Sequence, residues 1–234
     1  MTDTIYRAAA LIVPLVIAIV FHEVAHGYVA SLLGDPTARE RGRLSLNPLR
    51  HVDPIGTIVL PGILALATAP VFGWAKPVPV IAARLRNPRR DMMLVAAAGP
   101  ASNLVLALIG AVLLGLLARV YAGATAPAPV AGFIALNLYN FLLINIFLAL
   151  FNLLPIPPFD GSHIAEGLLP ERLADLYGRM RKFGFMLVLV LLIVLPWLIP
   201  GFDPVGRLLR PPVEWLSNHY LALADVVAGG AFGR

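Results

Sequence analysis

The stretch Phe21-His22-Glu23-Val24-Ala25-His26-Gly27 lies near one end of an apolar run over residues 6–33. Positions four apart lie on one face of an α-helix, so His22 and His26 can point at the same metal ion, with Glu23 beside them. Ionisable side chains within such an apolar segment are costly and are usually functional. The pattern therefore predicts a metal site on a membrane-spanning helix and disfavours a solvated helix face.

The composition indicates an integral membrane protein. Of the 234 residues, 59% are hydrophobic and only 13% are charged. A soluble chain of this size has too much surface to cover with so few polar residues. The formal charge of +5 does not predict nucleic-acid binding, because the basic residues fall in short loops between apolar runs, as the positive-inside rule expects. Since the chain holds no cysteine, a bound metal would have nitrogen and oxygen ligands.

Four apolar runs are long enough to cross a bilayer, over residues 6–33, 92–121, 131–154 and 183–199. The connection over residues 37–91 holds half of the 18 lysines and arginines, so we expect it to face the cytoplasm and the N-terminus to face outside. His26 then lies roughly 10 Å from the cytoplasmic end of its helix. We expect an all-α, multi-pass protein of the cell membrane, with one membrane-embedded domain over residues 1–234. In the tail, residues 200–234, the sequence fits either an amphipathic helix over 213–227 or a loosely packed end.

The connection between the first two spans contains short β-like runs over residues 43–48 and 55–61. Asn-Pro, Asp-Pro and Pro-Gly pairs bound these runs, which predicts a small β-hairpin. The apolar residues 63–72 that follow are too few to span a bilayer. We expect this region to lie in the membrane interface or to re-enter the membrane, and the alternative is an ordinary loop with an interfacial helix.

A catalytic zinc usually has three protein ligands and an open water position, so the histidine pair needs a third partner. Asp160 is the strongest candidate, because the proline-broken end of the third span can place its carboxylate at the same depth as His26. Its alternative role is that of an aspartate in a turn before glycine. The other candidates lie in connections, near turns or in the tail: His51, His163, His219, Glu166 and Asp53.

Three motifs, in this order, resemble those of the site-2 protease family of intramembrane zinc metalloproteases. They are His22-Glu23-Val24-Ala25-His26, then Gly99-Pro100-Ala101-Ser102-Asn103, and then residues 152–161. The last is similar to the family pattern Asn-x-x-Pro-x-Pro-x-x-Asp-Gly, with Phe159 where leucine is commoner. The resemblance covers residues 11–164. The loop between the second and third spans is too short for the PDZ domain of some members, and we expect no CBS domain, so the chain resembles a short form of the family.

The resemblance implies a three-helix catalytic core over about residues 6–165 and hydrolysis of peptide bonds within or near transmembrane segments, as in regulated intramembrane proteolysis. It implies one zinc ion on His22, His26 and Asp160, with Glu23 as the catalytic base. It suggests that Asn152 and Asn103 contact the substrate or the developing oxyanion, although helix packing explains Asn152 equally well. The implied partners are a transmembrane protein substrate and the lipid bilayer, and the oligomeric state is not predicted.

A helical substrate hides its carbonyl groups in its own hydrogen bonds, so it must unwind before cleavage. We expect an exposed edge within residues 44–60 to pair with the unwound substrate as an added strand, with Ile58 and Val59 in contact with it.

Two other functions use the same residues. A membrane zinc carrier would need a continuous polar path across the bilayer, and the outer halves of the predicted spans offer little beyond asparagines. A catalytically inactive relative that acts as a membrane scaffold typically lacks the acid or a ligand, whereas Glu23 and Asp160 are both present.

Overall fold

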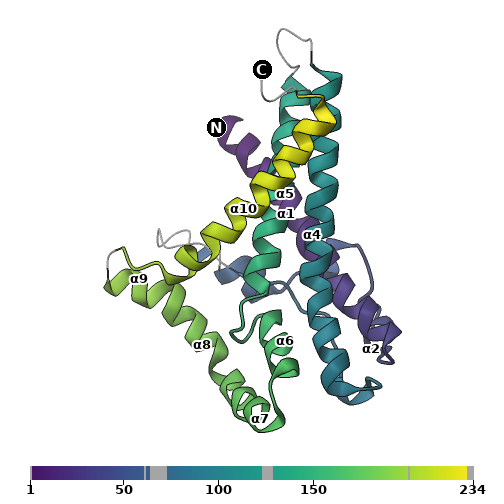
Figure 1. Ribbon diagram of the computed structural model, residues 1–234, viewed down its shortest axis with the longest axis vertical. Coiled ribbons are helices and arrows are strands. Elements are labelled where there is room, and N and C mark those ends of the chain that lie inside the picture. Colours follow the sequence, from purple (N-terminus) through teal and green to yellow (C-terminus); the bar gives the residue numbers. More distant parts are fainter. Residues whose placement is uncertain (1, 61, 64–72, 123–128, 200, 231–234) are drawn as a thin grey trace. The chain divides into compact units, whose positions relative to one another are not determined.

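The computed structural model describes residues 2–60, 62–63, 73–122, 129–199 and 201–230 (Figure 1). Within these ranges the chain is largely helical and forms no β-strand. Four helical segments are long and apolar enough to cross a membrane. They lie in α1 (Thr2–Leu32), α4 (Pro88–Val120), α5 (Pro129–Asn152) and the run Glu171–Leu198. The prediction of an all-α protein with four such helices is therefore confirmed.

The run Glu171–Leu198 joins several short helical pieces. These are α7 (Glu171–Met180), η4 (Arg181–Phe183), α8 (Gly184–Leu189), η5 (Val190–Val194) and α9 (Leu195–Leu198). The sequence predicted only residues 183–199, because the first of these pieces alternates charged and apolar residues. The predicted fourth span lies within this run as far as Leu198.

The chain divides into two compact units, and the division falls inside α1 and α4. One unit comprises residues 1–18, 101–151 and 207–234. The other comprises residues 19–100 and 152–206. We call them the asparagine unit and the histidine unit, after the buried polar groups described below. Each is described by itself.

In the asparagine unit, α4 and α5 pack with α10 (Pro204–Ala228) around small and branched side chains (Figure 1). The buried core consists of Ala107, Ala111, Leu142, Ile146 and Ala224. A Cβ atom on Gly110 would lie 3.1 Å from Phe141, so these helices approach closely. The tail, for which the sequence left two conformations open, is thus a helix that covers part of this core.

In the histidine unit, the end of α1 packs against the start of α4 through a second core that includes Ala30, Leu85 and Val95. The chain leaves α1 through Gly34, whose φ of 113° favours glycine. It then forms the short helix α2 (Thr37–Glu40). Asp35 is fully buried at this corner and accepts hydrogen bonds from the backbone N–H and the hydroxyl of Thr37.

The predicted β-hairpin between the first two spans is wrong for the described residues. Residues 48–51 form the 3₁₀-helix η1 (Pro48–His51), and residues 54–59 form the π-helix η2 (Pro54–Val59). The oxygens of Asn47 and Asp53 accept hydrogen bonds from backbone N–H groups of these helices. Asn-Pro and Asp-Pro therefore act here as an N-cap followed by a first-turn proline, which are signals that begin a helix. The expectation for residues 63–72 lies outside the described residues, apart from Ile63.

A short helix, α6 (Asp160–Leu168), follows α5 after a turn-rich segment, residues 153–159. The turns are held by local hydrogen bonds from Ile156 N to Leu154 O and from Phe159 N to Ile156 O. A Cβ atom on Gly161 would collide with the carbonyl of Leu153, so this glycine allows the break to fold tightly. The break makes Asp160 the first residue of α6.

Candidate metal centre

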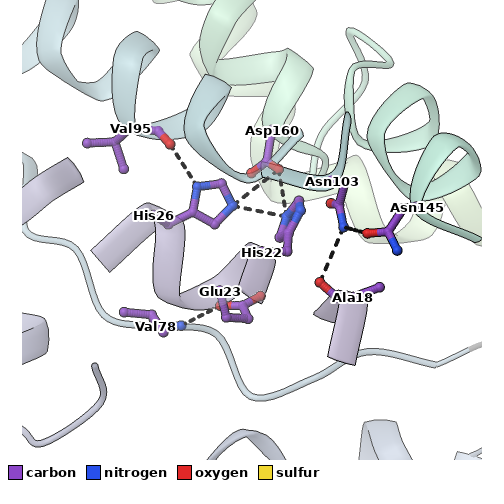
Figure 2. Close-up of polar contacts among 9 residues, drawn as sticks. All are labelled: Ala18, His22, Glu23, His26, Val78, Val95, Asn103, Asn145 and Asp160. Carbon is purple, nitrogen blue, oxygen red and sulfur yellow. Dashed lines mark hydrogen bonds and ion pairs between the residues drawn. The ribbon is translucent and has the colours of Figure 1, made fainter. Parts of the chain in front are cut away.

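Three side-chain atoms converge within the histidine unit (Figure 2). Nε2 of His22 lies 3.0 Å from Nε2 of His26. Oδ2 of Asp160 lies 3.1 Å from the first of these nitrogens and 3.3 Å from the second. The two histidines come from one face of α1, and the carboxylate comes from the first turn of α6.

The spacing of these atoms fits a tetrahedral zinc ion. Donor atoms at about 2 Å from such an ion lie about 3.3 Å from one another. Nδ1 of His26 lies 2.7 Å from the carbonyl oxygen of Val95, which can only accept, so Nδ1 carries the ring proton. Nε2 of the neutral ring then presents a lone pair. Oδ2 of Asp160 is buried and has no hydrogen-bond partner among the described residues. The three side chains are therefore placed so that they could hold a metal ion.

Gly99 of α4 makes room for the two imidazole rings. A Cβ atom there would lie 2.5 Å from Nε2 of His26 and 2.6 Å from Cε1 of His22. Any side chain at this position would displace the histidines.

The carboxyl group of Asp160 is held in its ionised form. Burial by itself raises the pKa of Asp160, but hydrogen bonds and positive charge from His22 and His26, when these imidazoles are protonated and hold no metal, outweigh burial and lower the pKa well below its usual range. An acidic residue in the first turn is also favoured by the helix dipole of α6. The residue is therefore available as an anionic ligand at neutral pH.

Two arginines hold the other end of α6. Arg89 of α4 donates hydrogen bonds to the carbonyl oxygens of Glu166 and Leu169, and Arg181 pairs with the carboxylate of Glu166. Cations near a helix C-terminus satisfy carbonyl groups that lack helical partners. These contacts fix the direction of the helix that carries Asp160.

A cavity of about 510 Å³ lies beside α6. Burial and the nearby Arg181 lower the pKa of His163, which lies one turn after Asp160. This imidazole is therefore neutral at pH 7. The lining includes Arg89, Met92, His163, Glu166 and Arg181.

Glu23 lies next to His22 on α1 and turns its carboxylate toward an extended segment that precedes α4. Its Oε2 accepts a hydrogen bond from the backbone N–H of Val78, with a distance of 2.7 Å (Figure 2). The sequence predicted the acid but not this donor.

Asn103 and Asn145 form a separate pair within the asparagine unit. Nδ2 of Asn103 donates to Oδ1 of Asn145 at 2.8 Å and to the carbonyl oxygen of Ala18 at 3.2 Å. Nδ2 of Asn145 donates to the carbonyl oxygen of Phe141 at 2.8 Å. The role predicted for Asn103 at the substrate or oxyanion stays a prediction, as does that of Asn152, the last residue of α5.

Ile58 and Val59 lie in η2 instead of on a strand edge, and the side chain of Ile58 lies outside the described residues. Substrate pairing along a strand at this position is therefore not supported, and contact between these residues and a substrate stays a prediction. Among the other residues considered as ligands, His51 is buried with Nε2 2.8 Å from the carbonyl oxygen of Ser45. His219 lies in the asparagine unit, with Nδ1 2.7 Å from the carbonyl oxygen of Trp215.

The sequence matches known zinc peptidases. Residues 117–195 match the model of peptidase family M50. Two relatives are named "Putative zinc metalloprotease": YwhC of Bacillus subtilis (strain 168) and Rip2 of Mycolicibacterium smegmatis (strain ATCC 700084 / mc(2)155). The chain is 40% identical to YwhC over 205 residues, which are 85% of this chain and 90% of that protein. It is 34% identical to Rip2 over 173 residues, which are 74% of this chain and 62% of that protein. No solved structure is significantly similar to the chain.

Proposed function

Because the chain belongs to peptidase family M50, the site-2 protease family of zinc metalloproteases, we propose that it hydrolyses peptide bonds within or near transmembrane segments of other membrane proteins. That the protein is a membrane-associated zinc metalloprotease follows from the family and from its four apolar helices. The proposal adds the substrate class and the residues that act. The observation that carries it is the convergence of His22, His26 and Asp160, whose donor atoms all lie within 4.8 Å of one another.

In this proposal the three residues hold one zinc ion. Zinc bound there would polarise the scissile carbonyl group and lower the pKa of a water molecule. The Val95 carbonyl keeps the ring proton of His26 on Nδ1 and so leaves Nε2 for the metal. The ionised Asp160 offsets part of the positive charge that the site receives.

Glu23 is the general base of the proposed reaction. Its carboxylate accepts a proton from the attacking water and delivers that proton to the nitrogen of the leaving amine. Val78 already occupies Oε2, so Oε1 is the atom that transfers the proton. An amide N–H of Asn152 or Asn103 that reached the developing oxyanion would contribute about 3 kcal/mol to the transition state.

The proposed setting is the cell membrane. Residues 1–234 act as one peptidase domain, with α1, α4 and α5 as a three-helix catalytic core over about residues 6–165. The basic residues between α1 and α4 support an N-terminus outside and an active site near the cytoplasmic face. There, water reaches the site without crossing the bilayer.

The test compares purified wild-type protein with the Glu23→Gln variant. Both are incubated with single-span membrane proteins in detergent or liposomes, cleavage is followed by mass spectrometry, and bound zinc is assayed. We expect equal zinc in both proteins and cleavage by the wild type alone. Equal zinc without cleavage by either protein would favour a zinc carrier or a scaffold, and cleavage by both would remove Glu23 from the reaction.

A further inference from the structure

The extended segment before α4 contacts Glu23 through one backbone group. The N–H of Val78 donates to Oε2 of Glu23 at 2.7 Å, and both residues belong to the histidine unit (Figure 2). A hydrogen bond to an ionised carboxylate is stronger than one between neutral groups. This contact is therefore strong enough to decide which way the glutamate points.

Prolines flank this donor on both sides. Residues 76–80 read Lys-Pro-Val-Pro-Val, so Val78 carries the one backbone N–H among residues 77–79. Proline fixes φ near −65°, and a residue before proline is restricted to extended conformations. The backbone at Val78 is therefore stiff, and its N–H keeps one direction.

Both ends of the segment are anchored. The N–H of Lys76 donates to the carbonyl oxygen of His51 at 2.8 Å, and Arg43 donates to the carbonyl oxygen of Lys76 at 2.8 Å. At the other end, the N–H of Ile81 donates to Oδ2 of the buried Asp35 at 2.6 Å. The segment is thus fixed before and after the residue that contacts Glu23.

The side chain of Val78 is also packed against α1. It is only 7% exposed, and a Cβ atom on Gly27 would lie 2.7 Å from its Cγ1. Gly27 directly follows His26, the last residue of the metal-binding motif. Because it has no side chain, Val78 can come close to α1 at this point. Side-chain packing and the amide hydrogen bond therefore act on the same short part of α1.

We propose that Val78 positions the general base: its backbone N–H holds Oε2 of Glu23 and leaves Oε1 aimed at the reacting water. The inference rests on the proposed role of Glu23 as the base. A glutamate has three side-chain torsions, and a misplaced catalytic group loses much of its rate advantage. Val78 is a positioning residue in this scheme, because it acts through Glu23.

The first experiment compares the Val78→Pro and Val80→Pro variants. Val78→Pro removes the donor in a backbone already restricted to extended conformations. Val80→Pro is the matched control, since the described residues offer the N–H of Val80 no hydrogen-bond partner. We expect Val78→Pro to lower kcat about 10- to 100-fold, the range for a hydrogen bond to a charged group, with KM and zinc content unchanged. We expect Val80→Pro to retain the wild-type kcat, and equal kcat values in the two variants would overturn the proposal.

A second replacement covers the case in which Val78→Pro does not fold. The amide of residue 78 is replaced by an ester through incorporation of the α-hydroxy analogue of valine, which deletes the N–H and keeps the side chain. The same ester at residue 80 is the control. We expect kcat to fall at residue 78 alone, with a monodisperse protein and full zinc occupancy. A normal kcat for the residue 78 ester, or an equal loss at both positions, would contradict the inference.

The Glu23→Asp variant separates positioning from a general loss of structure. Its shorter side chain cannot keep both the contact with Val78 and the position of its other oxygen. The ester at residue 78 should therefore lower its residual kcat much less than it lowers that of the wild type. If the ester lowered kcat by the same factor in the wild type and in Glu23→Asp, the coupling between Val78 and Glu23 would be rejected. If Glu23→Gln is inactive while the ester variant is normal, this inference fails and the proposed function stands. If Glu23→Gln cleaves substrate normally, both fail.

Discussion

The two buried polar groups of this protein differ in how their hydrogen bonds are satisfied. In the asparagine unit, Asn103 and Asn145 are fully buried, and the amide of each donates to an oxygen within the unit. In the histidine unit, His22, His26 and Asp160 bring three possible metal-ligand atoms to 3.0 to 3.3 Å from one another. The first group is complete without a ligand, whereas the second could hold a metal ion. A polar group whose hydrogen bonds are satisfied internally stabilises helix packing, and a cluster of two imidazoles and a carboxylate can hold a metal ion.

Among the variants that test this comparison, Asp160→Asn has the largest expected effect. Asparagine keeps the shape but removes the charge, and its amide group can donate toward the two imidazoles instead of accepting a cation. We expect cleavage to stop and zinc affinity to fall by more than about 100-fold, which is the upper range for changes in residues that only hydrogen-bond to a metal ligand. Zinc titration of the chelator-treated protein measures this effect. Wild-type zinc affinity in the variant would exclude Asp160 as a ligand.

The Gly99→Ala variant probes the space around the rings. The added methyl group would lie 2.5 Å from the ring of His26, so we expect a loss of about 10- to 100-fold in zinc affinity and lower activity. Gly110→Ala in the asparagine unit is the matched control, with a nearest contact of 3.1 Å. It should leave zinc affinity unchanged, and equal losses in the two variants would remove the distinction between the sites.

The Asn145→Ala variant should affect stability instead of zinc. It removes the acceptor of Asn103 in a fully buried position, so we expect a loss of about 1 to 3 kcal/mol in the free energy of unfolding. Replacing both asparagines with leucine should cost less than the sum of the single replacements, because no donor is then left alone. Denaturant unfolding in detergent, with zinc assayed in parallel, checks both statements. A drop in zinc content at constant stability would contradict them.

The smallest expected effect concerns pH and Asp35, which anchors the segment next to Glu23. Burial by itself raises the pKa of Asp35, but hydrogen bonds from Thr37 and from the N–H of Ile81 outweigh it and lower the pKa. A lowered pKa stabilises the fold above the ordinary value of about 4, and this contribution is lost as the pH falls through the folded value.

The Asp35→Asn variant should therefore unfold at a lower temperature than the wild type at pH 7. The difference should shrink as the pH falls from about 4 toward the lowered pKa of the folded state, since Asp35 of the unfolded chain takes up its proton first and the folded carboxylate follows. Thermal unfolding from pH 3 to pH 7 measures it. The control is Asp203→Asn, a conservative change at an exposed cap of α10. A difference that is constant with pH would assign the effect of Asp35 to shape and not to charge.

The sequence predicted the parts of the molecule that depend on spacing. The spacing of four positions from His22 to His26 places both on one face of any α-helix, and apolar length defines a candidate span. The proline break before Asp160 predicted the end of a span, and the structure begins α6 at that residue. These features need no knowledge of the remaining chain.

The features that sequence reasoning missed depend on backbone groups, or on residue pairs that fit both a strand and a helix. Asn47-Pro48 and Asp53-Pro54 fit the end of a strand or the start of a helix, and side-chain oxygens that cap backbone N–H groups decide for the helix. The carbonyl of Val95 and the N–H of Val78 are groups that nearly every residue carries. Only the fold determines which of them meets His26 or Glu23.

One consequence follows from the position of Asp160 at the start of its own short helix. A single zinc ion would link two imidazoles of the first span to a carboxylate that follows the third span. This link would close a long loop of chain. Because the unfolded chain does not form this site, zinc binding would stabilise the folded state by mass action. Chelators would then act as denaturants, and the supply of free zinc in the cell would set the lifetime of the protein as well as its turnover number.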